Sequence, residues 1–143
     1  MVKEHMSCIA KLVWLVPFLI SCNNGGSNVA TYAYLQVTPN IIPPVYRANI
    51  GESASMVFSN TIVSNSGSPQ ARYDITAVTP NSNFSILVTE SGNNGCRQVS
   101  ANQTCNITIV FTPSAESNYS TNNLMQFTVG SLESTVNVVT APF

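Results

Sequence analysis

From residue 29 onward, the sequence is divided into short runs rich in Val, Ile, Thr, Tyr and Phe, separated by clusters of Gly, Pro, Asn and Ser. Runs of this composition favour strands, and the clusters between them favour turns. In the clearest run, residues 105–112, the side chains of Ile107, Ile109 and Phe111 fall on one face of an extended chain. No stretch shows the apolar spacing of an amphipathic helix. The chain therefore predicts an all-β domain.

Seven strands are expected, with turn signals between them. They cover residues 32–38, 54–63, 71–79, 83–89, 104–112, 123–130 and 134–140. Short strands at this spacing predict a sandwich of two antiparallel sheets. The segment 38–44 contains three prolines and cannot lie in a central strand, because proline lacks a backbone donor. We expect the first strand to bend there and pass from one sheet to the other.

The N-terminal segment has the features of an export signal. Lys3 and Lys11 precede the apolar run LVWLVPFLI at residues 12–20, which is the order of a signal peptide. Nine residues are too few for a transmembrane helix, which needs about 20. Met6 is an alternative start, since the segment that follows it keeps a positive charge before the apolar run.

The run ends in Leu19-Ile20-Ser21-Cys22, which resembles the lipobox of bacterial lipoproteins. The resemblance implies a signal peptide at residues 1–21 and lipidation of the Cys22 thiol (diacylglyceryl, with palmitate-type chains). The polar stretch that follows, rich in Asn, Gly and Ser, predicts a flexible tether at 22–30 before the sandwich domain at 31–143. Two or three acyl chains give stable membrane anchoring. A plain secretory signal with an incidental cysteine is the alternative. Asn23, where an aspartate often marks inner-membrane retention, favours the outer membrane of the cell envelope.

Four features recur together in one group of bacterial immunoglobulin-like domains: Asn-Ser-Gly after a strand, Phe-Ser in a later strand, two cysteines about nine positions apart, and a strand ending in Phe-Thr-Pro followed by a tyrosine. They correspond here to residues 64–67, Phe84-Ser85, Cys96 and Cys105, Phe111-Thr112-Pro113 and Tyr119. Residues 50–140 thus resemble the ASH/HYDIN-type (choice-of-anchor D-like) immunoglobulin-like domain. One departure is Ala101-Asn102-Gln103, where the family usually has Gly or Pro. The resemblance implies a seven-stranded sandwich used for binding or spacing, without catalytic residues.

Cys96 and Cys105 are expected to form a disulfide, because an exported domain enters an oxidising compartment. The alternative is a pair of metal ligands. Zinc sites need about four nitrogen or sulfur ligands, and the chain after Cys22 contains no histidine and no further cysteine. The sequence therefore predicts no metal and no cofactor.

The charged residues exclude several function classes. After processing, three cations (Arg47, Arg72, Arg97) stand against five anions (Glu52, Asp74, Glu90, Glu116, Glu133), which leaves a net charge of about −2. Nucleic-acid binding is not expected, because it needs clustered cations. The only histidine, His5, belongs to the signal, so a Ser-His or Cys-His nucleophile is excluded. The carboxylates are scattered singly, and we predict that the protein is not an enzyme.

These observations favour a non-enzymatic, lipid-anchored envelope protein that presents one immunoglobulin-like domain for protein or glycan binding. An exposed edge strand or the loops 64–70, 90–104 and 113–123 would supply the contacts. The alternative is a structural subunit of an envelope assembly or secretion machine, which would use strand 54–63 or the C-terminal strand as an apolar edge. A third hypothesis is an inhibitor of a host or rival enzyme, acting through the disulfide-bonded loop 90–104.

Overall fold

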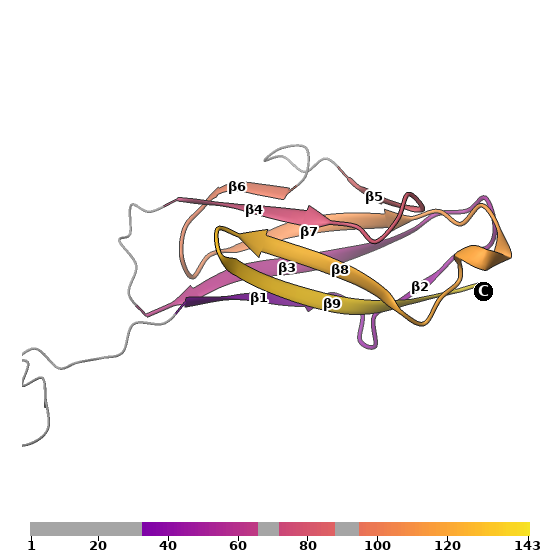
Figure 1. The fold of residues 1–143 in the computed structure, drawn as a ribbon, viewed down its shortest axis with the longest axis horizontal. Coiled ribbons are helices and arrows are strands. Elements are labelled where there is room, and N and C mark those ends of the chain that lie inside the picture. The colour runs from indigo at the N-terminus through magenta and orange to yellow at the C-terminus, as the bar shows by residue number, and fades with distance from the viewer. Residues whose placement is uncertain (1–32, 66–71, 88–94) are drawn as a thin grey trace, which may run out of the picture.

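The computed structural model describes residues 33–65, 72–87 and 95–143. The expected signal peptide 1–21, the lipidation residue Cys22 and the tether 22–30 lie outside the described residues. The described part is a sandwich of two β-sheets whose strands run along the long axis of the domain (Figure 1). Its strands are β1 Ala33–Pro39, β2 Val45–Arg47, β3 Ala54–Ser64, β4 Tyr73–Val78, β5 Phe84–Ile86, β6 Gly95–Val99, β7 Thr104–Phe111, β8 Asn123–Val129 and β9 Leu132–Ala141.

The seven predicted strands are confirmed with shifted ends, and two further strands, β2 and β6, are present. The four-stranded sheet has the order β1-β3-β7-β5, and the five-stranded sheet has the order β2-β9-β8-β4-β6. If β1, β3, β4, β5, β7, β8 and β9 are taken as strands A to G, these orders contain the ABED and GFC orders of the immunoglobulin fold. All neighbours are antiparallel except β2 and β9, which run parallel. The fold is therefore an immunoglobulin-like β-sandwich with one mixed sheet.

The passage of the first strand between the sheets, predicted from the prolines, is confirmed. β1 is an edge strand of the four-stranded sheet, and β2 is an edge strand of the five-stranded sheet. Pro39 ends β1 at this edge, where a missing backbone donor breaks no internal ladder. Because β1 pairs with β3 only as far as Phe58, it leaves the first residues of β3 without a strand neighbour on that side.

The core lies between the two sheets and is built from alternate residues of the long strands. β3 shows the pattern most clearly, because its even-numbered residues from 56 to 62 are buried while their neighbours are more exposed. Phe58 of β3 meets Phe127 of β8 across the sandwich, with ring centroids 5.1 Å apart. The largest fully buried side chains are Tyr46, Phe58, Phe111, Phe127, Met56, Ile62, Ile75, Ile107, Ile109, Met125, Val138 and Asn60.

Two predictions about individual strands are wrong. Strand 54–63 was expected to offer an exposed edge, but β3 pairs with β1 over residues 58–64 and with β7 over residues 54–61, so only its first residues lack a strand neighbour on one side. Its alternating pattern reveals which side chains face the core, whereas the identity of its neighbours depends on the rest of the chain. Residues 90–104 were expected to form a loop, but residues 95–99 within them form β6, which pairs with β4.

β6 departs from regular alternation because it contains a bulge. Its register against β4 shifts between Tyr73 and Ile75, so that Arg97 and Gln98 together face a single residue, Asp74. Gln98 has a φ of 57°, and its N–H donates to the Asp74 carboxylate over 2.9 Å. Asp74, one of the scattered carboxylates of the sequence, thus stabilises the bulge.

Gly95 is required where β6 approaches β4. A Cβ at this position would overlap the backbone oxygen of Ile75. We expect Gly95→Ala to lower the free energy of unfolding by about 1–3 kcal/mol, the usual cost of inserting an atom into filled space. Urea denaturation checks this, with exposed Arg97→Ala on the same strand as the control. Equal stability of the two variants would contradict the close approach of the strands.

Candidate binding surface at the far end of the sandwich

Four of the eight exposed large apolar side chains of the described region, including the two most exposed, lie in a few segments on one part of the domain. The chain enters the described region at Ala33, and the C-terminal residue lies at the opposite end (Figure 1). We call the part of the domain formed by residues 40–53, 112–122 and 142–143 the far end; within it, the connection between β1 and β2 protrudes from the side of the domain (Figure 1). Ile41, Ile42, Ile50 and Phe143 are 43%, 79%, 51% and 81% exposed there. The other exposed large apolar side chains of the described region come from separate positions on the strands or directly after β5: Tyr34, Val78, Leu87 and Leu124.

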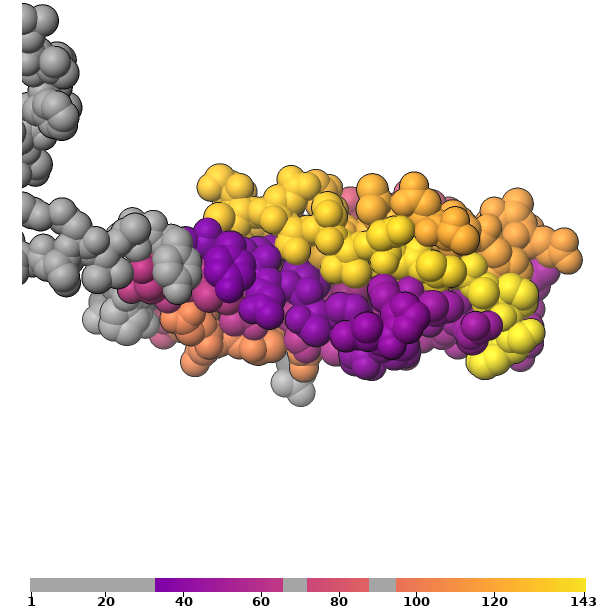
Figure 2. All heavy atoms as spheres, turned by 90° about the horizontal axis from the view of Figure 1, so that it is seen from below, coloured from indigo at the N-terminus to yellow at the C-terminus, as the bar shows by residue number. Residues whose placement is uncertain are grey.

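Two grooves open at the far end. The first groove has a volume of about 490 Å³, and its walls come from the β1–β2 connection, β2, the start of β3 and the C-terminal residue. Figure 2 shows the yellow C-terminal residues beside the purple segment around β2 on this face. Its lining residues are Ile41, Ile42, Pro43, Val45, Tyr46, Arg47, Ala54, Ser55 and Phe143.

The second groove has a volume of about 630 Å³ and is lined by Asn49, Ile50, Glu116, Tyr119 and Pro142. The only charged residue in its lining is the anion Glu116, whereas the only charged residue in the lining of the first groove is the cation Arg47. The far end thus combines apolar walls with one charge of each sign, in two separate grooves. This combination suits a partner with apolar side chains and a few matching charges.

Tyr46 holds β2 in place between the two sheets. Its ring is buried and lies 5.6 Å from the ring of Phe84 and 6.0 Å from that of Phe111, measured between centroids. Its hydroxyl donates to the backbone oxygen of Ile109 on β7 over 3.0 Å. Burial raises the pKa of Tyr46 well above its ordinary value, so the hydroxyl remains protonated and keeps donating. Tyr46 therefore ties the edge of one sheet to the interior of the other.

Side chains also position the loop 112–122, which corresponds to the predicted contact loop 113–123. The Tyr119 hydroxyl donates to the backbone oxygen of Ala48 over 2.9 Å, which links this loop to the segment after β2. The Asn118 side-chain oxygen accepts from the backbone N–H groups of Ser114 and Ala115. These bonds give the loop a defined shape, as a binding surface requires.

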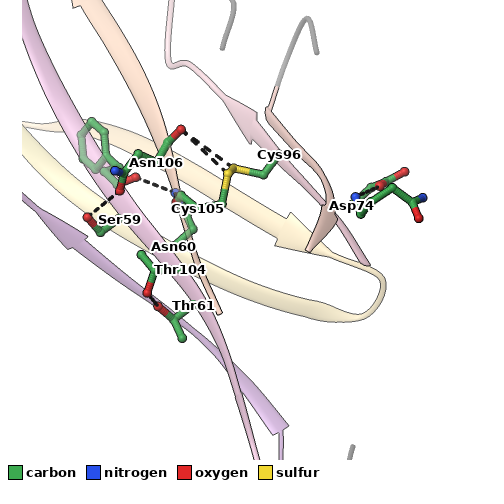
Figure 3. The surroundings of a disulfide bond; sticks show 10 residues. Ser59, Asn60, Thr61, Asp74, Cys96, Thr104, Cys105 and Asn106 are labelled. Carbon is green, nitrogen blue, oxygen red and sulfur yellow. Dashed lines mark hydrogen bonds between the residues drawn. A yellow bond between two sulfur atoms is a disulfide. The ribbon is translucent and has the colours of Figure 1, made fainter. Parts of the chain in front are cut away.

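The two cysteines lie away from the far-end grooves, in a disulfide that joins the two sheets (Figure 3). Cys96 belongs to β6 of the five-stranded sheet and Cys105 to β7 of the four-stranded sheet, with Cα atoms 6.2 Å apart. Asn60, beside Cys105 on β3, is buried and donates its amide to the backbone oxygen of Phe58 over 2.8 Å. Its side-chain oxygen has no hydrogen-bond partner among the described residues.

The remaining candidate residues are distributed over the domain. Glu52 accepts from the backbone N–H of Asn49, Glu116 begins the short 3₁₀ helix Glu116–Asn118, and Glu133 lies exposed on β9. Glu90 lies outside the described residues, as do most residues of the predicted contact loop 64–70. Within the described ranges, no group of three or more His, Cys, Asp or Glu could hold a metal ion. No helix found in the same ranges is long and apolar enough to cross a membrane.

The strand edges decide which predicted contacts are available. β9 pairs with β8 along its length and with β2 only at Val139–Ala141. The C-terminal strand, predicted as an apolar edge, therefore has a second strand neighbour among the described residues only at its end, and Leu132 to Val138 pair on one side. The first groove was not predicted from the sequence, because its walls come from segments far apart in the chain. The signal that pointed to it was the proline-rich segment 38–44.

No protein-family model matches the sequence, and no curated protein matches it. A weak structural likeness is found to a solved structure described as "Structure of surface layer protein SbsC, domains 1-6". It shares 13% sequence identity, with a TM-score of 0.46 over 78% of this chain. The match spans 14% of that longer protein, so the likeness concerns part of it only.

Proposed function

We propose that the protein is a non-enzymatic lipoprotein of the bacterial cell envelope whose immunoglobulin-like domain binds another envelope protein or a glycan. The observation that carries this proposal is the gathering of exposed apolar side chains at the far end, opposite the point where the chain enters from Cys22. An exposed apolar surface of this kind marks interaction sites on soluble domains. A domain held at its N-terminal end would present this surface away from the membrane.

Two further observations support the envelope location. The segment Leu19-Ile20-Ser21-Cys22 resembles a lipobox, and the following Asn23 favours the outer membrane. The disulfide between Cys96 and Cys105 is the kind of bond that persists in oxidising compartments such as the periplasm. The order of strands and the position of the two cysteines also suit an ASH/HYDIN-type domain, which we propose as the family. The alternative of a structural subunit would use the side of β9 from Leu132 to Val138 that no described strand pairs with, because β1 covers β3 over residues 58–64.

Lipidation can be tested with two matched cysteine variants of the export segment. We expect Cys22→Ser to abolish incorporation of labelled palmitate. The protein should then be found in the soluble fraction or as the uncleaved precursor, in place of the lipidated membrane form. Cys8→Ser should behave as wild type, because His5 stands three residues before Cys8, where a lipobox has an aliphatic residue. Mass spectrometry of the N-terminal peptide provides the direct measurement. Palmitate incorporation that survives Cys22→Ser would contradict the proposal.

The binding role can be tested in intact cells by photo-crosslinking from two positions. A photoreactive residue at position 42, at the far end, is expected to capture an envelope protein or glycan as a discrete product. The same residue at position 124 is the control, because Leu124 is 53% exposed but lies on β8 away from both grooves. Equal products from both positions, or none from position 42 across growth conditions, would contradict a far-end binding surface.

A further inference from the structure

We propose that the first groove binds an extended peptide by strand addition, in the place beside β3 that β1 leaves when it passes to the other sheet. The inference rests on the proposed binding function and names the chemistry of the partner. It follows from the backbone groups that face the groove, from its apolar wall and from the charge of Arg47.

The ladder between β1 and β3 does not reach the first residues of β3. β1 pairs with β3 from Ala33 opposite Ser64 to Pro39 opposite Phe58. Asn40 closes this ladder: its N–H donates to the Val57 oxygen over 2.9 Å, and its side-chain oxygen accepts from the Val57 N–H over 3.0 Å. Beyond this point β1 has left the sheet, and the first two residues of β3, Ala54 and Ser55, pair with β7 and line the first groove.

The backbone of Ser55 faces this open side. Residues of a strand in antiparallel pairing direct their N–H and C=O groups alternately to one neighbour and the other. Val57 directs both of its groups to Asn40, on the β1 side. Ser55, two residues earlier, directs its own groups to the same side, and it lines the groove. Ser55 thus presents one donor and one acceptor in the geometry that an added strand needs.

The opposite wall of the groove is also a strand edge. The backbone bonds from Val139 N–H to Pro44 oxygen and from Ala48 N–H to Ala141 oxygen show that even-numbered residues here face β9. Val45 and Arg47, which alternate with them, direct their backbone groups away from β9. Both residues line the first groove. The groove is therefore bordered by open backbone edges on β2 and on β3.

The side chains around the groove define the sequence that such a strand would carry. Ile41, Ile42 and Phe143 form an apolar wall with a large exposed fraction. Arg47 is the only charged residue in the lining, and one of its guanidinium N–H groups donates to the Pro142 oxygen over 3.3 Å. Because a guanidinium has five N–H donors, further donors can bind a carboxylate. The occupant is therefore an extended peptide with apolar side chains and an Asp or Glu placed at Arg47.

The proposal can be tested with an array of immobilised random hexapeptides probed with the full chain. We expect the bound set to be enriched in apolar residues with one Asp or Glu. The hexapeptide that binds most strongly in solution is then made in two methylated versions, one with its odd-numbered and one with its even-numbered backbone nitrogens methylated. One version should bind at least about tenfold more weakly, because it lacks the N–H groups on the edge that pairs with the protein. Arg47→Gln should weaken binding about tenfold or more, and Arg97→Gln, on the far edge strand β6 of the same sheet, should not.

Hydrogen exchange of the full chain gives an independent readout. We expect the Ser55 amide to exchange rapidly without peptide and to become protected when the selected hexapeptide binds, while the Met56 amide stays protected throughout. Binding that is unaffected by methylation of either register, or an array with no bound peptide, would overturn the proposal. Protection of the Ser55 amide that rises with protein concentration would also overturn it, because a second copy of this chain would then occupy the groove. The lipidation and crosslinking results do not depend on these outcomes. A failure of the strand-addition proposal can therefore be distinguished from a failure of the proposed function.

Discussion

Replacement of Tyr46 by alanine is expected to lower the free energy of unfolding by about 3–5 kcal/mol, the range for truncating a buried aromatic side chain. The ring is buried against Phe84 and Phe111, which also contact each other, and solvent cannot replace its contacts without opening the sandwich. The same change also removes the hydrogen bond to the Ile109 oxygen. Denaturation in guanidinium chloride with the disulfide intact measures the loss.

Two variants separate the contributions of the Tyr46 side chain. Tyr46→Phe keeps the ring and removes only the hydroxyl, so it should cost about 1–3 kcal/mol, the penalty for leaving a buried carbonyl without its donor. Leu124→Ala, at an exposed position of β8, should change the stability by about 0.5 kcal/mol or less. If Tyr46→Ala lost no more than Leu124→Ala, the assignment of Tyr46 as the link between the sheets would be wrong.

Removal of the disulfide is the second change with a large expected effect. The cysteines are nine residues apart in sequence, and closing so short a loop restricts the unfolded chain by about 2.7 kcal/mol in the chain-entropy model. We expect the double variant Cys96→Ala, Cys105→Ala to lose about this free energy of unfolding. The loss should concentrate on β6, because β4 is its only strand neighbour in the described region.

The position of the loss can be measured by hydrogen exchange. Amides of β6 should exchange much faster in the double variant, whereas amides of β8, which is paired on both sides, should change little. Reduced wild-type protein provides the control and should match the double variant. An oxidised wild type with the same stability as the double variant would show that the bond contributes nothing.

The alternation of apolar residues predicted the long strands well, because their side chains meet two different environments. β7 illustrates this: Ile107, Ile109 and Phe111 are buried as the pattern indicates, and the residues between them are more exposed. Alternation failed for β6, whose inward residues Cys96 and Val99 are three positions apart because the bulge adds a residue. β2 is only three residues long, too short for any periodicity to show.

The candidate site was harder to predict than the strands. The sequence indicated that the prolines of 38–44 would move the chain between sheets, and the structure confirms this passage. It did not indicate that the passage would open a groove, because the groove also depends on Ser55 and Phe143, which are distant in the chain. The importance of Arg47 likewise depends on neighbours that only the fold brings together.

The orientation of β1 has a mechanical consequence for a domain held at one end and bound at the other. β1 runs along the long axis from Ala33, and its hydrogen bonds to β3 lie across that axis (Figure 1). A pull on Ala33 against a partner at the opposite end would shear the whole ladder, from Ser64 to Phe58, at once. Strands loaded in shear resist extension together, whereas strands peeled apart yield one bond at a time. Such a module would hold its shape under tension between a membrane and a bound neighbour.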